Sequence, residues 1–256
     1  METATRTAWF RFYEELNDFL PAERRQADFP YSFRGRPSVK DAVEAVGVPH
    51  TEVDLILVNG RSVDFHYHLE PGDRVSVYPV FESLDITPVL RLRPEPLRRP
   101  SFILDVHLGK LARRLRCLGF DTVYRNDFTD EQLIGEAERE SRIILTRDRN
   151  LLKHGRVLRG SWVRSGRLEE QVGEIVERFD LARQFRPFTR CLPCNGPVVP
   201  VPKSEVEDRL PPRTKAEFHE FTRCRVCGRV YWKGSHYDRL AAVVNHLGGP
   251  GRPGAA

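Results

Sequence analysis

The sequence predicts an α/β protein in which a small mixed domain precedes a parallel sheet flanked by helices and a cysteine-containing segment. Three observations support this prediction. Short strand and helix patterns alternate from residue 101 to 186, which is typical of a parallel sheet covered by helices. Residues 7–81 place one short helix among several strands, and two Cys-x-x-Cys pairs begin at Cys191 and Cys224. The 256 residues are enough for more than one domain.

Changes in the sequence pattern set the domain boundaries. Four prolines between 87 and 100 interrupt any periodic pattern and predict a linker. A second break near 183–187 separates the alternating region from the paired cysteines. We therefore predict domains at 1–86, 101–186 and 187–240, a linker at 87–100 and a flexible tail at 241–256.

Charge is unevenly distributed along the chain, although the formal net charge is only +5. Residues 1–90 carry 9 basic and 15 acidic side chains, whereas residues 183–256 carry 13 basic and 6 acidic ones. A polyanion such as RNA would therefore meet the C-terminal half, unless the arginines only form a solvated surface. No apolar run is long enough to cross a membrane and the start lacks a signal-peptide pattern, so we expect a cytoplasmic protein without a membrane partner.

The first domain combines one helix with strands that turns separate. Residues 8–12 alternate like a strand, and a helix is expected over 39–46 after a capping serine. Asn59-Gly60 predicts a hairpin after a strand at 53–58, and another strand is expected at 74–78. This order resembles the ubiquitin-like β-grasp domain of sulfur carriers. Because carriers end in a free Gly-Gly and this chain continues, we expect a structural module or one that binds a protein partner.

Aspartates follow strands of the predicted parallel sheet. Asp105 comes directly after the strand 102–104, and Asp148 follows the strand 143–146. Parallel strands place their carboxyl ends at one edge of a sheet, so both side chains are expected there, with a third from 127–131. Asp105 or Asp148 alone is better explained as a helix cap, but the two together favour a shared site. Carboxylates that converge need a cation, which predicts bound Mg²⁺ or Mn²⁺.

The helix expected over 108–118 has one leucine-rich face and one basic face. A carboxylate at the start of such a helix can hold a divalent cation while basic side chains hold the neighbouring phosphates of a phosphodiester substrate. The side chains that we expect to bind RNA are those of Lys110, Arg113, Arg147 and Arg149.

Four cysteines form two pairs, Cys191 with Cys194 and Cys224 with Cys227. Two such pairs can close a tetrahedral Zn²⁺ site, and the patterned loop between them is typical of a zinc ribbon. Disulfides are disfavoured in the cytosol, and four cysteine ligands leave no position for water, so the zinc is expected to be structural. The remaining cysteine, Cys117, is predicted to be an inert thiol.

Several segments of the chain resemble a known nuclease family. These segments are Phe102-Ile103-Leu104-Asp105, residues 108–116, residues 118–122 and Leu145-Thr146-Arg147-Asp148 with the four residues that follow. Over residues 101–240 they are similar to the PIN-related ribonucleases of the Mut-seven C-terminal type. The resemblance implies a PIN-like fold and metal-dependent cleavage of RNA. It also implies that Asp105 and Asp148 are acidic site residues, with Asp130 preferred to Asp127 as the third. The sequence departs from the family pattern at Val106-His107, where His107 is a candidate substrate contact.

The leading interpretation is a metal-dependent ribonuclease, in which Mg²⁺ or Mn²⁺ held by Asp105, Asp130 and Asp148 activates water for attack on phosphate. The alternative is a non-catalytic RNA-binding adaptor, in which the aspartates are helix caps and the zinc ribbon supplies affinity. Tyr231 and Trp232, beside the second cysteine pair, either stack RNA bases or cover the core of the ribbon. Substitution of the aspartates by asparagine separates the two interpretations, because only an enzyme would lose cleavage while it kept RNA binding.

Overall fold

The computed structural model describes residues 5–79 and 100–248, which fold as two compact units. The first unit joins the N-terminal residues to residues 134–162, and the second joins residues 100–133 to the part of the chain after 162. Each unit therefore consists of two separate stretches of sequence. The predicted linker at 87–100 lies outside the described residues except for its last position, Pro100.

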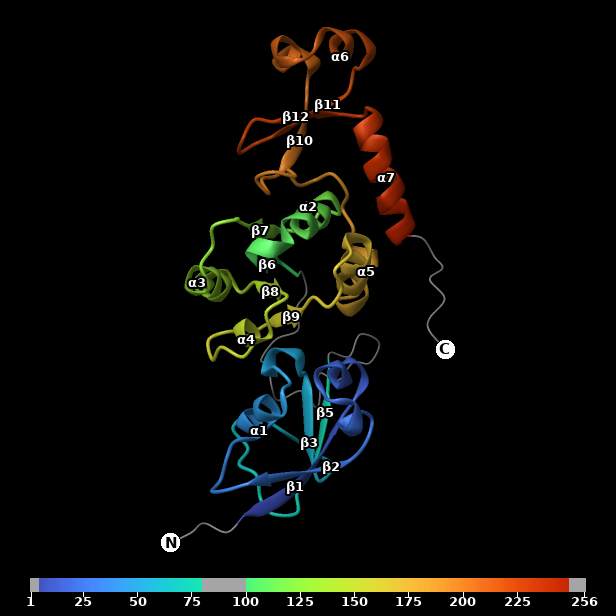
Figure 1. Ribbon diagram of the computed structural model, residues 1–256. Helices are drawn as coiled ribbons and strands as arrows, with labels where there is room; N and C mark the ends of the chain where they lie inside the picture. Colours follow the sequence, from blue (N-terminus) through green and yellow to red (C-terminus); the bar gives the residue numbers. More distant parts are fainter. Residues whose placement is uncertain (1–4, 80–99, 249–256) are drawn as a thin grey trace. The chain divides into compact units, whose positions relative to one another are not determined.

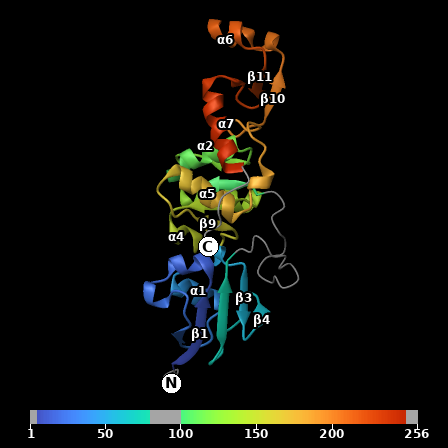
Figure 2. The same ribbon diagram turned by 90° about the vertical axis from the view of Figure 1, so that its right-hand side faces the viewer.

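A five-stranded sheet forms the N-terminal part of the first unit (Figures 1 and 2). Its order is β2-β1-β5-β3-β4, and β1 pairs in parallel with β5 while the other neighbours are antiparallel. The strands are β1 (Arg6–Phe12), β2 (Phe29–Phe33), β3 (Leu55–Val58), β4 (Arg61–Val63) and β5 (Arg74–Tyr78). This mixed sheet with one helix confirms the predicted ubiquitin-like fold.

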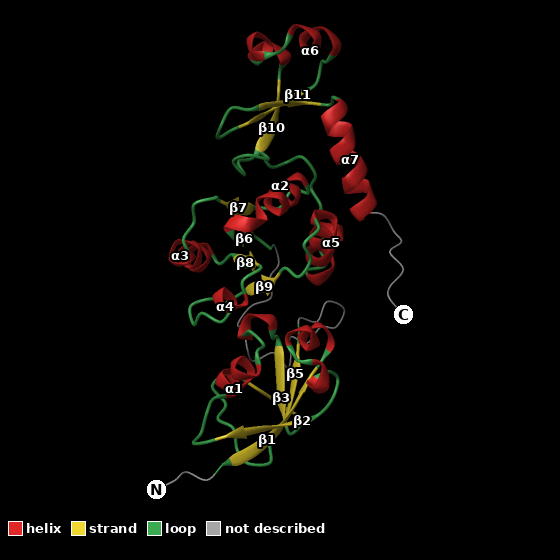
Figure 3. Cartoon of the chain, in the orientation of Figure 1, coloured by secondary structure: helices red, strands yellow, loops and turns green. Residues whose placement is uncertain are grey.

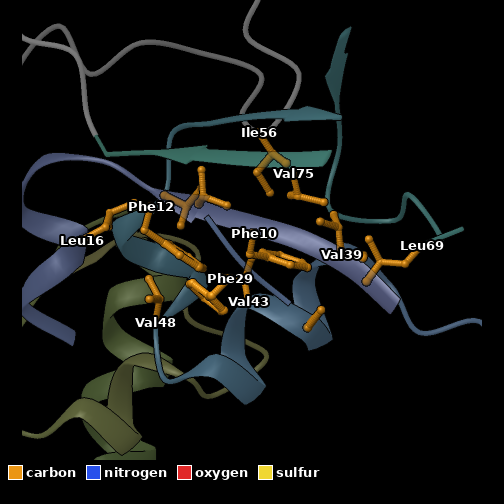
Figure 4. Packing of buried hydrophobic residues seen from close by; sticks show 14 of the residues in the cluster. Phe10, Phe12, Leu16, Phe29, Val39, Val43, Val48, Ile56, Leu69 and Val75 are labelled. Carbon is orange, nitrogen blue, oxygen red and sulfur yellow. The ribbon is translucent and has the colours of Figure 1, made fainter. Parts of the chain in front are cut away.

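One face of this sheet packs against helix α1 (Val39–Val46) in an apolar core (Figure 4). Phe10 and Phe12 alternate with exposed residues along β1, so both side chains reach the same core. Val39 and Val43 lie one helical turn apart on α1 and are fully buried in it. The pattern of strand and helix periodicity therefore accounts for the core.

Local signals fix the ends of α1 and the turn after β3. The Oγ of Ser38 accepts a hydrogen bond from the backbone N–H of Asp41 at 3.1 Å, and the Asp41 carboxylate accepts one from the Ser38 N–H. The helix ends at Gly47, whose φ of 117° suits a left-handed cap. Asn59 and Gly60 both have positive φ, as a two-residue hairpin turn requires. The predicted helix and hairpin are thus confirmed.

The strands between residues 102 and 162 belong to a parallel sheet. Strand β6 pairs with β7 in the second unit, and β8 pairs with β9 in the first. These strands are β6 (Phe102–Leu104), β7 (Thr122–Tyr124), β8 (Ile143–Thr146) and β9 (Gly160–Trp162). The helices that follow them are α2 (Gly109–Cys117), α3 (Asp130–Glu140), α4 (Arg149–Leu152) and α5 (Leu168–Arg178). The alternation of strand and helix, visible in Figure 3, confirms the predicted α/β class.

The C-terminal part of the second unit contains a three-stranded antiparallel sheet of order β10-β11-β12. Its strands are β10 (Val198–Val201), β11 (Phe221–Cys224) and β12 (Val230–Trp232), with the short helix α6 (Pro212–Glu217) in the long loop. Cys224 is the last residue of β11 and Cys227 lies between β11 and β12, whereas Cys191 and Cys194 precede β10. This layout is compatible with the expected zinc ribbon.

Helix α7 (Ser235–Gly248) occupies the start of the segment for which a flexible tail was predicted at 241–256. Leucine and valine recur at helical spacing from residue 240 to 247, and Val244 is buried, which explains why this part is helical and not a tail. Residues 249–256 lie outside the described residues. Within the described ranges, the structure contains no helix that is long and apolar enough to span a membrane.

Candidate functional site

Asp105 lies directly after β6 at the start of a tight turn. Its Oδ1 accepts a hydrogen bond from the backbone N–H of His107 at 3.4 Å, so the carboxylate caps the turn. The hydroxyl of Tyr124 on β7 donates to the Val106 carbonyl at 2.9 Å. A side chain at Gly109 would come within 2.7 Å of that tyrosine ring, so the glycine permits this close contact. These contacts hold the turn that carries Asp105, whose side chain is half-buried.

Asp148 is the N-cap residue of α4 and follows β8 by two positions. Its Oδ1 accepts a hydrogen bond from the backbone N–H of Asn150 at 2.8 Å. Its own backbone N–H donates to the Thr146 Oγ1 at 2.9 Å. The side chain is exposed. The carboxylate is therefore oriented by local hydrogen bonds while it remains open to solvent.

The two candidates for the third carboxylate differ in their surroundings. Asp130 is the exposed first residue of α3. Asp127 accepts two hydrogen bonds from the guanidinium of Arg125, at 2.9 and 2.8 Å, and these bonds lower the pKa of its carboxyl group. Because that pair uses both oxygens of Asp127, Asp130 is the better candidate for a metal ligand.

The expected RNA-binding side chains fall into two groups. Those of Lys110, Arg113 and Arg147 are exposed, as is the candidate contact His107. Arg149 is half-buried, and its guanidinium carbon lies 3.7 Å from the centroid of the Trp162 ring. Arg149 therefore has an aromatic partner within its own unit, a contact that sequence analysis did not foresee.

The four paired cysteines lie together in the second unit. All four Sγ atoms lie within 4.8 Å of one another, with Cys191 and Cys227 at 3.5 Å and Cys194 and Cys224 at 3.4 Å. A tetrahedral zinc site with Zn–S bonds of about 2.3 Å separates its sulfur atoms by about 3.8 Å, so this donor set fits zinc. Over residues 5–79 and 100–248, no other group of three or more Cys, His, Asp or Glu side chains is gathered so closely.

The environment of each thiol differs, although the four are close together. Burial raises the pKa of Cys191, and it raises the pKa of Cys194 to about 12. Burial also raises the pKa of Cys224, but hydrogen bonds from the backbone N–H groups of Cys227 and Val226 and from the Cys194 and Cys227 thiols together lower it to about 7. Since zinc binds thiolates, a bound cation would offset the cost of ionising the thiols with raised pKa values.

The aromatic residues beside the second cysteine pair belong to the ribbon itself. Trp232 packs against a small core that contains Val206, Leu210 and Phe221. The hydroxyl of Tyr231 lies 3.0 Å from the Sγ of Cys191 and is within hydrogen-bonding distance of it. Of the two explanations that the sequence left open, the packing of Trp232 favours the one in which it covers the ribbon core.

The first cysteine pair is bound to α2 through Arg116, which is only 3% exposed. The Nη1 of Arg116 donates to the carbonyls of Leu192 and Pro193 at 2.9 and 2.8 Å, and its Nε donates to the Thr122 carbonyl at 2.8 Å. One buried guanidinium therefore links α2, β7 and the turn between the first two cysteines. The role of Arg116 is not evident from the sequence, because the Leu192 and Pro193 carbonyls that it binds lie more than 70 positions away.

A second link joins the same turn to the start of β7. The Asn195 side chain donates to Oδ1 of Asp121 at 2.7 Å and accepts a hydrogen bond from the Thr122 N–H at 3.0 Å. Arg190 donates to Oδ2 of Asp121 at 3.0 Å. The cysteine-bearing turn and the parallel strands of the second unit are thus one hydrogen-bonded structure.

Two family models match the chain. The model described as the Mut7-C ubiquitin matches residues 5–85, and the one described as the Mut7-C RNAse domain matches residues 100–244, more than half of the chain. The chain belongs to the Mut7-C RNAse domain family. The Mut7-C match includes all three candidate aspartates and the cysteine quartet, and together the two matches confirm the resemblance seen in the sequence. No curated protein and no solved structure matches the chain.

The match to an RNAse domain indicates a nuclease-like function related to RNA, and the ubiquitin-like part indicates interaction with protein. The Mut7-C domain offers three kinds of chemical group for such a function. They are three aspartates beside strand and helix ends, exposed basic side chains on and near α2, and four clustered thiols.

Cys117 is the one cysteine of the Mut7-C domain outside the cluster. It is 1% exposed, and burial raises its pKa to about 11. Its thiol is therefore neutral at pH 8 and shielded from reagents. We expect a thiol reagent at pH 8 to modify less than one equivalent in metal-loaded protein, and all five cysteines after denaturation with a chelator. Rapid labelling of Cys117 in the folded protein, located by mass spectrometry, would contradict this expectation.

Proposed function

We propose that the chain is a PIN-like, metal-dependent ribonuclease that hydrolyses RNA phosphodiester bonds at a site formed by Asp105, Asp130 and Asp148. The main support is that two of these aspartates follow strands of a parallel sheet within a chain of an RNAse family. Parallel strands direct their carboxyl ends to one edge of a sheet, where such proteins bind their ligands. Carboxylate oxygens are the ligands that Mg²⁺ and Mn²⁺ prefer.

The chain's own groups have separate roles in this proposal. The turn N–H groups of His107 and Asn150 orient the carboxylates of Asp105 and Asp148. When bound, a divalent cation lowers the pKa of a water molecule and offsets the charge that develops on the phosphate. The exposed basic side chains bind the flanking phosphates and hold the scissile bond in line with the carboxylates. Those side chains are Lys110, Arg113 and Arg147.

We further propose that Cys191, Cys194, Cys224 and Cys227 bind a structural Zn²⁺. The support is the fit of their Sγ distances to a tetrahedral site. Four thiolates leave no open position for a substrate or water, so this site stabilises the fold and takes no part in cleavage. Reduced cysteines of this kind suit a cytoplasmic protein.

The experiment is cleavage of labelled structured and unstructured RNA with Mn²⁺, Mg²⁺ or neither. We expect metal-dependent cleavage by the native protein and a loss of at least about 100-fold in the Asp105→Asn, Asp148→Asn double variant. Such a loss corresponds to about 3 kcal/mol of transition-state stabilisation, within the several kcal/mol that a metal ion supplies. RNA binding should be retained. Asp208→Asn, an exposed carboxylate in the ribbon loop, is the matched control and should cleave normally.

A non-catalytic RNA-binding adaptor is the second candidate function. It is favoured by the capping hydrogen bonds that Asp105 and Asp148 accept, because a helix cap needs no metal. RNA binding without cleavage under every metal condition would overturn the nuclease proposal and leave the two aspartates as caps.

A further inference from the structure

The N-terminal domain contacts the segment that begins with Arg149. The Arg149 guanidinium carbon lies 3.7 Å from the centroid of the Trp162 ring and 5.2 Å from that of Phe19. The rings of Phe19 and Trp162 are themselves 5.1 Å apart between centroids. Trp162 also packs against the apolar core of the N-terminal domain. Arg149 is therefore held by one aromatic ring from the N-terminal domain and one from β9.

The backbone of this segment is held by the N-terminal domain as well. Glu52, which is fully buried, accepts a hydrogen bond from the Trp162 N–H through its Oε1 at 2.5 Å. The Nε2 of buried His50 donates to the Val157 carbonyl at 2.8 Å. Both hydrogen bonds join a side chain of the N-terminal domain to a main-chain group more than 100 positions later in the sequence. They fix the position of the strand that carries Trp162.

The segment cannot hold this geometry by itself. Helix α4 has only four residues, far fewer than an isolated helix needs for stability in water. Its N-cap is Asp148, and Arg149 is its first residue. The direction of the Asp148 carboxylate therefore depends on how the first turn of α4 is anchored, and Arg149 supplies a contact directly at that turn.

We propose that the surface of the ubiquitin-like domain around Phe19, His50 and Glu52 has its partner in the same chain. That partner is the segment from Arg149 to Trp162, and Arg149 is a positioning residue for Asp148 instead of an RNA contact. This inference rests on the proposed function of Asp148 as a metal ligand. The ubiquitin-like domain is then a required part of the nuclease, because it anchors one of the carboxylate-bearing turns.

The proposal predicts a separation between RNA binding and turnover. Arg149→Lys keeps the positive charge but loses the flat guanidinium that stacks on the rings. If Arg149 positions Asp148, this variant lowers kcat about 10-fold or more, the usual cost when a group that orients a metal ligand is lost, and leaves KM for RNA unchanged. Arg147→Ala removes an exposed neighbour and should instead raise KM with little change in kcat.

Hydrogen exchange of the full-length protein tests the anchoring without reference to activity. The peptide over 146–152 contains the amides of Asp148 and Asn150, which donate to Thr146 and Asp148 side chains. We expect these amides to exchange about 10-fold faster in Arg149→Lys and in Phe19→Leu, because local opening becomes easier. Trp9→Leu is the matched control, since Trp9 is an aromatic residue of the same domain that is 44% exposed.

The rates of hydrogen exchange can either support or overturn the proposal. Faster exchange in the two variants with no change in Trp9→Leu supports it, even if the native protein cleaves no RNA, in which case the nuclease proposal alone fails. Unchanged exchange in Arg149→Lys overturns it, whatever Phe19→Leu does to the stability of the N-terminal core. A rise in KM with unchanged kcat for Arg149→Lys would also overturn it, because that is the behaviour of an RNA contact.

Discussion

Removal of the metal from the four cysteines is expected to unfold the sheet β10-β11-β12. The apolar core of this sheet has only three buried residues, Val206, Leu210 and Phe221. Structural zinc contributes about 10–16 kcal/mol in small zinc-binding domains, which matches or exceeds the net stability of a typical domain, about 5–15 kcal/mol. A core of this size cannot compensate for such a loss.

The loss of folded structure after metal removal should extend from the sheet β10-β11-β12 into α2 and β7. Burial lowers the pKa of Arg116, yet its hydrogen bonds to the Leu192 and Pro193 carbonyls keep the guanidinium satisfied in the folded protein. Once the turn that carries those carbonyls is disordered, a buried cation loses partners, which costs about 3–5 kcal/mol in comparable cases. We therefore expect faster hydrogen exchange over 111–124 as well as over 190–232.

The measurement compares Cys224→Ser, which removes a ligand, with Cys117→Ser, which removes a buried thiol outside the cluster. Bound zinc should fall well below one equivalent in the first variant and remain at one equivalent in the second. The melting temperature should fall by about 10 °C or more only for Cys224→Ser. Chelated protein whose exchange over 190–232 matches that of the metal-loaded protein would contradict the prediction.

A methyl group at Gly119 is expected to lower the free energy of unfolding by about 3 kcal/mol or more. Gly119 follows Leu118, the C-cap of α2, and has a φ of +98°, which costs other residues about 1–3 kcal/mol. Its Cβ would also lie 2.1 Å from the Arg186 carbonyl oxygen and 2.7 Å from the carbonyl carbon. Because the Arg186 N–H is itself bonded to the Leu118 carbonyl at 3.0 Å, that backbone is tied to the same turn.

Gly155→Ala is the matched control for this substitution. No heavy atom lies within 4 Å of a Cβ placed there, and Gly155 does not have positive φ. Its effect should stay within about 0.5–1 kcal/mol. Urea unfolding of both variants measures the difference, and equal midpoints would show that the chain around Arg186 moves away at no cost.

Elements with local signals were predicted well from the sequence. The bounds of α1, β5 and β6 match the expected ranges 39–46, 74–78 and 102–104. Capping residues, turn dipeptides and apolar periodicity all act within a few residues of the element that they define. Cysteine spacing is equally local within each pair, and it led to the correct cluster.

Elements that depend on distant partners were missed. Strand β2 contains Pro30, which argues against a strand, but β2 is at the edge of the sheet, where a missing N–H is tolerated. Arg116 finds its acceptors 76 and 77 positions away, at Leu192 and Pro193. The stacking of Arg149 on Phe19 likewise joins residues that no periodic pattern relates. The sequence therefore indicated the cysteine cluster but not the long-range contacts of Arg116 and Arg149.

The first unit is built from two separate stretches of sequence, so it cannot be completed until the second stretch has been synthesised. Phe19 and Trp162 are 143 positions apart, so at about 5–20 residues per second the nascent N-terminal domain waits roughly 7–30 s for β9 to be made. Until Trp162 has been synthesised, the Glu52 carboxylate cannot accept the hydrogen bond from the Trp162 N–H. The rate of translation up to residue 162 therefore sets how long the nascent chain exposes an incomplete first unit to chaperones.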